Sequence, residues 1–331
     1  MSPEISIIVP VYKGIRFLRE ALDSVKVQTF RDWECVCIDD GSKDGSGTLL
    51  DRLTADDPRF RVFHRANGGT SVARNFALSV ARGRYVAFLD EDDIYHPRLL
   101  EVLHMAAERL GTDVTGCEFA KFPEDGHPQW SENLPDDGDW RVAADRAAVA
   151  EWAADYYEGI PFEIWRNLYR REILAGHEFP PGVRVEQDLY WQYMLLPQIG
   201  SYARVNWQGY AWRASSIGGF LHPDPESLIS LTRTDRVILK AMHDSMGFSE
   251  SQMRRFMRQM SHFLYYCIWR PLHGGVELDS VEFGKLRDGL EILRSEGVCL
   301  RGHLGLRQRL CWMLFMWTGR VSWVRSTRRA R

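Results

Sequence analysis

The first 120 residues alternate between two periods of hydrophobic positions. Four apolar, β-branched runs are typical of strands buried on both faces. These runs are Ile5–Val11, Trp33–Asp39, Phe60–His64 and residues 84–90. Between them, apolar residues recur at helical spacing, for example in residues 17–25. The pattern predicts strands joined by helices, one of which would begin with Thr70 or Ser71 as its N-cap.

This β-α-β alternation implies an α/β fold with a Rossmann-like, doubly wound and mostly parallel sheet flanked by helices. In such sheets, ligands bind in the crevice beyond the carboxyl ends of the strands. The segments "PVYKG", "DDGS" and "DEDD" follow three of the predicted strands. We therefore expect a ligand site at this edge of the sheet, with acids from two strand ends in it.

Beyond residue 112 the periodic pattern weakens. Residues 113–140 have the composition of loops, and residues 141–220 combine helical stretches with strand-like pieces such as "SYARVNW". Residues 226–296 have helical spacing. We predict an α/β domain in residues 1–220, a helical C-terminal region in residues 221–300 and a separate tail in residues 301–331.

The composition, 45% apolar and 26% charged, is that of an ordinary globular protein, and the net charge of −3 argues against a nucleic-acid binder. The charge is uneven, because residues 301–331 contain eight arginines and no acid. Their apolar run Leu310–Trp317 is too short to span a bilayer, but Arg and Trp around it suit a membrane interface. Two interpretations stay open: attachment to the inner-membrane surface, and a C-terminal helix that packs on the body.

The six cysteines form no CxxC pair, and Cys35 and Cys37 alternate with apolar residues in a predicted strand. Buried thiols are therefore favoured over a metal site, and reduced cysteines suit the cytosol. The N-terminus lacks the features of a signal peptide, and no stretch has the length of a transmembrane helix. We expect a cytoplasmic protein, with peripheral attachment to the cytoplasmic face of the inner membrane as a hypothesis for the tail.

The acidic run from Asp90 to Asp93 carries the strongest chemical signal. Like charges this close raise each other's pKa unless a cation lies among them, although a solvated turn is the alternative. Carboxylate oxygens suit Mg²⁺ or Mn²⁺. Alternation along an extended segment would point Asp90 and Asp92 to one side. The glycine-rich "GSKDGSG" matches neither a dinucleotide fingerprint nor a P-loop, and the chain has no HExxH or GxSxG motif.

Two long segments, residues 5–46 and 57–101, carry several motifs in one order and spacing, among them "VPVYKG", "DDGS", "ARN" and "DEDD". They resemble the family 2 glycosyltransferases, inverting enzymes of the GT-A fold that build bacterial polysaccharides. A weaker similarity continues through "WRNLYRREIL", "VEQDLYW" and "YAWRASSIGG" to about residue 220. The resemblance implies that residues 1–220 are a GT-A catalytic domain. This domain would move a sugar from a nucleotide-sugar, most commonly a UDP-sugar, to a saccharide or lipid-linked saccharide acceptor.

The resemblance also implies a donor site. Its nucleotide-sugar-binding residues would be Pro10, Val11, Tyr12, Asp39, Asp40, Arg74, Asp90 and Glu91. Within this set, Asp40 would accept a hydrogen bond from the base with support from Asp39, and Arg74 would lie near the diphosphate.

In the same resemblance, "DED" is the DxD motif that holds a divalent metal. Asp92 would bind Mn²⁺ or Mg²⁺, and Asp90 would lie toward the ribose and contribute to the metal site. The cation would stabilise the departing diphosphate. Glu91 would point to the other side of the strand end, and Asp93 would help to cap or position the helix that begins near Pro97.

The general base of such enzymes is a carboxylate in a downstream "ED" motif. Here the local sequence is "VEQD", so Asp188 aligns with the base, Gln187 replaces the usual Glu, and Glu186 remains a rival. The base would take a proton from the acceptor hydroxyl as that oxygen attacks the anomeric carbon. An exposed acid at the start of a helix is the alternative for Asp188 and Glu186.

Two other functions stay open. A sugar-nucleotide nucleotidyltransferase can share the fold, but "PVYKGIRFL" lacks the glycine- and Arg/Lys-rich loop expected after its first strand. An inactive nucleotide-sugar-binding module is favoured by the change from "ED" to "QD" and opposed by the intact acids of the site. Lys13, where Asn is common, and Asn167, where Lys is usual, depart from the family pattern without changing the predicted fold.

Overall fold

A computed structural model describes residues 2–155, 159–161, 163–183, 187–214, 225–260 and 280–295. The chain divides into two compact units. The first comprises Met1–Val149, Phe162–Gly182 and Gln187–Ser216, and the second comprises Ala150–Pro161, Val183–Glu186 and Ile217–Arg331. The predicted site residues belong to the first unit, with the exception of Glu186, which lies outside the described residues.

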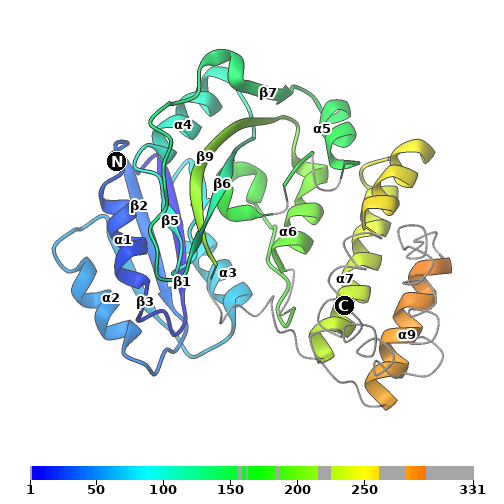
Figure 1. Ribbon diagram of the computed structural model, residues 1–331, viewed down its shortest axis with the longest axis horizontal. Coiled ribbons are helices and arrows are strands. Elements are labelled where there is room, and N and C mark those ends of the chain that lie inside the picture. Colours follow the sequence, from blue (N-terminus) through cyan, green and yellow to red (C-terminus); the bar gives the residue numbers. More distant parts are fainter. Residues whose placement is uncertain are drawn as a thin grey trace, which may run out of the picture. The chain divides into compact units, whose positions relative to one another are not determined.

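The first unit is built on one mixed sheet, whose strand order in the described part is β3-β2-β1-β4-β8-β6-β9-β5, with β7 paired to β9 (Figure 1). The strands are β1 (Ile5–Val11), β2 (Trp33–Asp39), β3 (Phe60–His64), β4 (Tyr85–Phe88), β5 (Ile94–Tyr95), β6 (Val114–Pro123), β7 (Trp140–Ala143), β8 (Asn167–Arg170) and β9 (Tyr202–Ala214). The predicted bounds of β1, β2 and β3 are confirmed.

One half of this sheet is parallel, as the sequence predicts. β1 pairs with β2 and β4, and β2 pairs with β3, all in parallel register. Every residue of β1 and β2 is buried, which explains their continuous apolar pattern. The other half is joined through β8, which runs antiparallel to β4 and β6, so the complete sheet is mixed.

Helices cover both faces of the sheet. They are α1 (Leu18–Lys26), α2 (Ser46–Thr54), α3 (Thr70–Val80), α4 (Leu99–Leu110), α5 (Arg146–Ala153) and α6 (Gln187–Leu195). α1 contacts α2, whereas α3 contacts β1 and β2. The chain reverses direction in the sheet after β3, so right-handed crossovers place α3 on the face opposite α1 and α2.

The start of α3 differs from the prediction. The N-cap is Gly69 at φ 86°, and it is neither Thr70 nor Ser71. This left-handed backbone favours glycine, and it lets the chain enter the helix without a side-chain cap.

The long strand β6 is one of the elements that the sequence pattern misses, because residues 113–140 lack a strict period of two. Gly116, Glu118 and Lys121 interrupt its apolar positions, and its pairing with β9 changes register on both sides of Glu118. A bulge of this kind moves side chains to the other face of a strand, which removes the alternation that would identify it.

The second unit is helical in its described part. It contains α7 (Pro225–Asp244), a helix over residues 250–260 and α9 (Ser280–Ser295). A Cβ on Gly289 would lie 2.2 Å from Oγ1 of Thr232, so the absence of a side chain lets α9 approach α7 closely. Among the residues described here, no helix is both long and apolar enough to cross a membrane. The predicted tail, residues 301–331, lies outside the described residues.

Candidate active site

The carboxyl ends of β2, β1 and β4 lie side by side at one edge of the sheet. Tyr12, Asp40 and Asp90 follow these ends directly or one residue later. Backbone hydrogen bonds extend the pairing, from Asp40 N to Val11 O at 2.9 Å and from Leu89 N to Ile8 O at 3.0 Å. The three predicted motifs therefore meet at one edge, as the parallel topology requires.

The acidic run forms a turn rather than the extended segment that the sequence suggested. The backbone N–H of Asp93 donates to the carbonyl oxygen of Asp90 at 3.1 Å, which closes a four-residue turn. Glu91 leans toward the end of β1, where its carboxylate accepts a hydrogen bond from the backbone N–H of Tyr12 at 3.3 Å. A Cβ on Gly14 would lie 2.6 Å from Cγ of Glu91, so glycine at this position makes room for the acid.

Asp93 does not cap the following helix, so the capping role is wrong. α4 begins at Leu99 after Arg98, whose side chain makes no capping bond, and the backbone N–H of Leu100 donates to Oε1 of Gln28 at 3.1 Å. Asp93 is buried and accepts two hydrogen bonds from β9, from the hydroxyl of Tyr210 at 2.7 Å and from the backbone N–H of Arg213 at 2.8 Å. Its role is to attach the acidic turn to the neighbouring strand.

Arg213 also supports the acidic turn, and no sequence motif identified this arginine as part of the site. Its side chain is 1% exposed and donates to the carbonyl oxygens of Asp92 at 2.7 Å and Glu124 at 2.8 Å. It also pairs with Glu20 at 2.9 Å, between the rings of Phe17 and Phe122. The available signal was a single arginine inside the apolar strand sequence "GYAWRA".

The turn concentrates negative charge in a partly buried place. Burial, together with the charges of Asp92 and Asp90, raises the pKa of Glu91 to about 8. Burial and the charge of Asp90 raise the pKa of Asp92 to about 6. The pKa of Asp93 also lies well above its ordinary value, first because of burial and then because of Asp92 and Asp90. A cation among these groups would offset the cost of ionising them.

The donor set of this turn fits a hard divalent cation. Among the described residues, the carboxylate of Asp92 forms no hydrogen bond with the side chain of another residue. Asp90 uses one carboxylate oxygen to accept a hydrogen bond from Arg74, and its other oxygen remains available. Two carboxylates on a shared turn are ligands that suit Mn²⁺ or Mg²⁺. These residues would hold such an ion, with further ligands from water and the diphosphate of a donor.

A second group of potential ligands lies at the opposite edge of the sheet. Glu4, His104 and Glu108 bring three ligand atoms within 4.8 Å of one another. Arg84 pairs with Glu4 at 3.1 Å and with Glu108 at 3.0 Å, so a guanidinium already neutralises this group. The acidic turn is therefore the better candidate for the metal.

Arg74 connects two of the predicted site residues. This arginine on α3 is 2% exposed, and it pairs with Asp90 at 2.7 Å and with Asp188 through its other terminal nitrogen. The two carboxylates raise the pKa of Arg74 despite its burial, so its charge is permanent. One guanidinium thus brings together the acidic turn after β4 and the start of α6.

Asp188 occupies the first turn of α6, and its side chain is 22% exposed. Burial raises its pKa to about 6, and the charge of Arg74 limits that increase. A carboxyl group with this pKa is mostly ionised at neutral pH and still accepts a proton readily.

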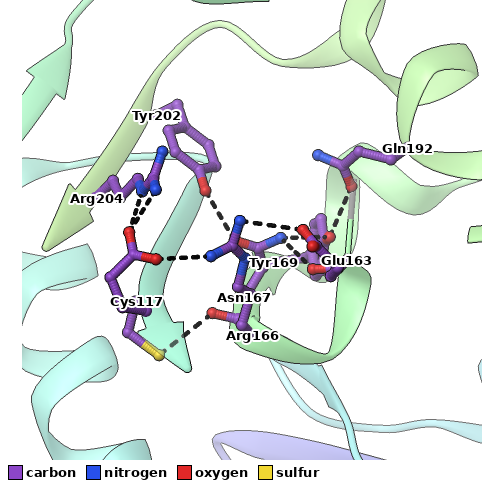
Figure 2. A network of polar contacts seen from close by, with 9 residues as sticks. Cys117, Glu163, Arg166, Asn167, Tyr169, Gln192, Tyr202 and Arg204 are labelled. Carbon is purple, nitrogen blue, oxygen red and sulfur yellow. Dashed lines mark hydrogen bonds and ion pairs between the residues drawn. The ribbon is translucent and has the colours of Figure 1, made fainter. Parts of the chain in front are cut away.

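A buried polar network holds α6 against the sheet, and Figure 2 shows it. Gln192, one turn after Asp188, accepts a hydrogen bond from the hydroxyl of Tyr169 at 2.7 Å. Asn167 donates to the same hydroxyl at 3.0 Å and accepts from Tyr202 at 2.8 Å. Asn167, the departure from the family pattern, is therefore a buried link between β8, β9 and α6.

The charged part of this network contains two arginines and two glutamates (Figure 2). Arg166 pairs with Glu118 at 2.9 Å and with Glu163 at 3.0 Å, and Arg204 also pairs with Glu118. Arg166 is buried, so its two acids are needed to balance its charge. The network fixes the segment that precedes β8 and, through Tyr169 and Gln192, the helix that carries Asp188.

The remaining predicted donor residues differ in accessibility. Pro10 and Val11 are buried in β1, and Tyr12 is 43% exposed. Asp39 bonds His64, the last residue of β3, and the backbone N–H of Ser42, both at 3.0 Å. These bonds outweigh burial and lower its pKa.

Asp40 is also buried, and its carboxylate already accepts three hydrogen bonds. The donors are the backbone N–H groups of Gly68 and Gly69, both at 2.8 Å, and the amide of Asn67 at 3.1 Å. Two carboxylate oxygens accept about four hydrogen bonds, so about one site is left for a ligand.

The sequence of this edge matches a known family. Residues 6–174 match the profile of Glycosyl transferase family 2, and they make up half of the chain. This protein belongs to glycosyl transferase family 2. The glycosyltransferase EpsJ of Bacillus subtilis is 34% identical over 194 residues, which cover 57% of this chain and 54% of that protein. The chain thus spans about half the length of this relative.

Solved structures with the same fold include S. aureus TarS and a mannosyltransferase from Pyrobaculum calidifontis. TarS 1-349 in complex with UDP-GlcNAc has a TM-score of 0.67 at 18% identity, covering 89% of this chain and 83% of that chain. The mannosyltransferase, in complex with GDP-Man and Mn²⁺, has a TM-score of 0.51 at 17% identity, covering 98% of this chain and 83% of that chain. These likenesses establish the GT-A fold, with a helical C-terminal region.

Proposed function

We propose that this protein is an inverting glycosyltransferase that moves a sugar from a nucleotide-sugar to an acceptor hydroxyl. The double ion pair of Arg74 carries this proposal, because it brings Asp188 and Asp90 to one point at the carboxyl edge of the sheet. A base and a metal-binding acid must both lie near the anomeric carbon in a single displacement. Membership of family 2 supports the same assignment.

Asp188 is the proposed general base. Its pKa of about 6 leaves it ionised at neutral pH, and Arg74 fixes its orientation. In the reaction, Asp188 takes the proton of the acceptor hydroxyl as that oxygen bonds to the anomeric carbon and the sugar–phosphate bond breaks. Glu186 remains the rival base.

The donor is proposed to bind along the ends of β1, β2 and β4. The exposed ring of Tyr12 offers a stacking surface for the base, and Asp40 keeps one acceptor site for it. Asp90 and Asp92 would hold Mn²⁺ or Mg²⁺, which when bound stabilises the charge of the departing diphosphate. The TarS complex with UDP-GlcNAc favours a UDP-sugar, while the GDP-Man complex shows that the fold also accepts another base.

The acceptor is proposed to be a saccharide or lipid-linked saccharide in cell-surface polysaccharide synthesis. Membership of family 2 supports this assignment, and Asp188 would assist a sugar hydroxyl as the nucleophile. Attachment of residues 301–331 to the cytoplasmic face of the inner membrane would bring the enzyme to such an acceptor.

Release of nucleotide from a panel of nucleotide-sugars, with Mn²⁺ and with EDTA, tests the proposal. Wild type is expected to release UDP from a UDP-sugar only with the metal. Asp188→Asn should retain donor binding and lose transfer by about 10²–10⁴-fold. Asp32→Asn, an exposed acid at the other edge of the sheet, is the matched control and should behave as wild type.

Each competing function has its own result in this experiment. An inactive binding module would bind donor and release nothing. A nucleotidyltransferase would instead consume a nucleoside triphosphate with a sugar phosphate and release pyrophosphate. A larger loss in Glu186→Gln than in Asp188→Asn would move the base to Glu186.

A further inference from the structure

A pocket of about 870 Å³ lies at the amino edge of the sheet. Its walls are residues 2–4 before β1, the second half of α3, the loop before β4 and residues 170–178 after β8. The strand β1 has 7 residues, so this edge lies about 20 Å from the acidic turn. The proposed transfer reaction uses none of the residues that line the pocket.

Four arginines line this pocket, namely Arg82, Arg84, Arg170 and Arg171. Two of them are fixed in place through their Nε atoms, which donate to backbone carbonyl oxygens. Arg170 donates to Thr112 at 2.9 Å, and Arg171 donates to Gly83 at 2.6 Å. Their terminal nitrogens therefore remain as donors, already positioned for a ligand.

Tyr85 contacts two of these arginines. The guanidinium carbons of Arg84 and Arg170 lie 5.2 and 5.4 Å from the centre of its ring. The ring thus helps to hold both side chains beside the pocket.

The acids nearby pair with only one of the four arginines in the described part of the chain. Glu4 and Glu108 both pair with Arg84, at 3.1 and 3.0 Å. Glu172 and Glu178 also line the pocket; both are exposed, and neither forms an ion pair with an arginine among the described residues. Arg82 is likewise exposed, and its side chain has no hydrogen-bond partner within the described part of the chain. The pocket thus offers several guanidinium groups with unused donors.

We propose that this arginine pocket binds a phosphate-bearing ligand, separately from the donor site. Arginine forks match the geometry of phosphate oxygens, and they bind them more strongly than neutral donors do. The volume lies within the range of small-molecule sites, with room for two linked phosphates and an attached group. The phosphate belongs either to a soluble molecule or to the headgroup of an anionic lipid.

Binding of inorganic pyrophosphate to the full chain in EDTA tests the proposal, because EDTA removes metal-dependent binding at the acidic turn. Wild type is expected to bind pyrophosphate. Arg82→Gln should weaken binding about tenfold, and Arg82→Gln with Arg171→Gln should abolish it. The side chain of Arg82 makes no hydrogen bond within the described part of the chain, and its backbone bonds to Ser6 and Glu34 are kept in Arg82→Gln, so this variant keeps the test valid if the Arg171 variant is unstable. Arg52→Gln removes the same charge from an exposed residue of α2, and this control variant should bind pyrophosphate as wild type does.

Sedimentation with phosphatidylglycerol vesicles, compared with phosphatidylcholine vesicles, identifies the source of the phosphate. Arg82-dependent binding to phosphatidylglycerol, without binding of pyrophosphate, would assign the pocket to a lipid headgroup. Arg82-dependent binding of pyrophosphate would assign it to a soluble ligand. If neither probe binds, or if binding is unchanged in the Arg82 variants, the proposal is wrong. The transfer reaction is measured separately with Asp188→Asn, so the two proposals fail independently.

Discussion

Arg74 determines the geometry of the proposed active site at the scale of one residue. A buried guanidinium is stable only when its charge is compensated, and here Asp90 and Asp188 provide that compensation. Lysine has one ammonium group and cannot form two directed pairs in the same way. The family resemblance implied that Arg74 lies near a diphosphate, but the sequence contains no information that one guanidinium contacts both acids.

The pKa of Asp188 gives the first prediction. Burial raises this pKa to about 6, and the base must be ionised to accept a proton. We expect kcat/KM for transfer to fall as the pH decreases through about 6 and to level off above it. A profile from pH 4.5 to 8.5 at saturating Mn²⁺ checks this. If kcat/KM falls only near pH 4, the pKa of the base is not raised, and the proposed buried environment of Asp188 is contradicted.

Lys13 provides the second prediction at this scale. Its φ of 58° lies in the left-handed region, which costs most residues about 1 kcal/mol and asparagine less. Its backbone N–H donates to Ser42 Oγ at 3.1 Å, which holds this conformation. Lys13→Asn, which restores the common family residue, should raise the free energy of unfolding by about 1 kcal/mol in urea. Lys43→Asn, an exposed control nearby, should change it by less than about 0.5 kcal/mol.

At the scale of elements, α6 depends on tertiary contacts for its position. Its sequence has little amphipathic character, but Gln192 bonds Tyr169 on β8, and Asp188 pairs with Arg74 on α3. These contacts join segments that are far apart in the chain. The sequence identified Asp188 through its family motif, whereas the hydrogen bonds that orient it could not be derived from spacing.

Removal of the Tyr169 hydroxyl tests this support of α6. Tyr169→Phe leaves Gln192 and Asn167 without one buried partner each, which should cost about 1–3 kcal/mol of unfolding free energy. Turnover should fall more than donor affinity does, because α6 carries the base and not the donor contacts. Tyr190→Phe on the same helix, where the hydroxyl has no bond among the described residues, is the control. Equal effects of the two substitutions on turnover would exclude the proposed role.

At the scale of the whole sheet, the two edges carry different clusters of charged residues. The carboxyl edge carries the acidic turn with Arg74 and Arg213, and the amino edge carries the arginine pocket with several glutamates. This arrangement follows from the topology, because residues that precede parallel strands and residues that follow them lie at opposite edges.

Binding of Mn²⁺ should stabilise the whole fold. An ion that binds only the folded state at a hundred times its Kd adds about 2.7 kcal/mol, which we expect as an increase in Tm at pH 8. Protons compete with the metal, and the pKa of Asp92 is about 6, so the increase should be much smaller at pH 5. Asp92→Asn should abolish it, and Asp32→Asn should not. A full increase in the Asp92 variant would contradict the metal assignment.

The sequence by itself determined the parallel half of the sheet, the edge where the motifs meet and the family. Strands buried on both faces and glycine-containing turns are local patterns, so the bounds of β1, β2 and β3 could be read directly. The tertiary structure decided the pairing of Arg74 with two acids, the attachment of Asp93 to β9 and the strand β6. These features depend on which distant segments lie together, and the burial that makes their charges significant exists only after the chain has folded.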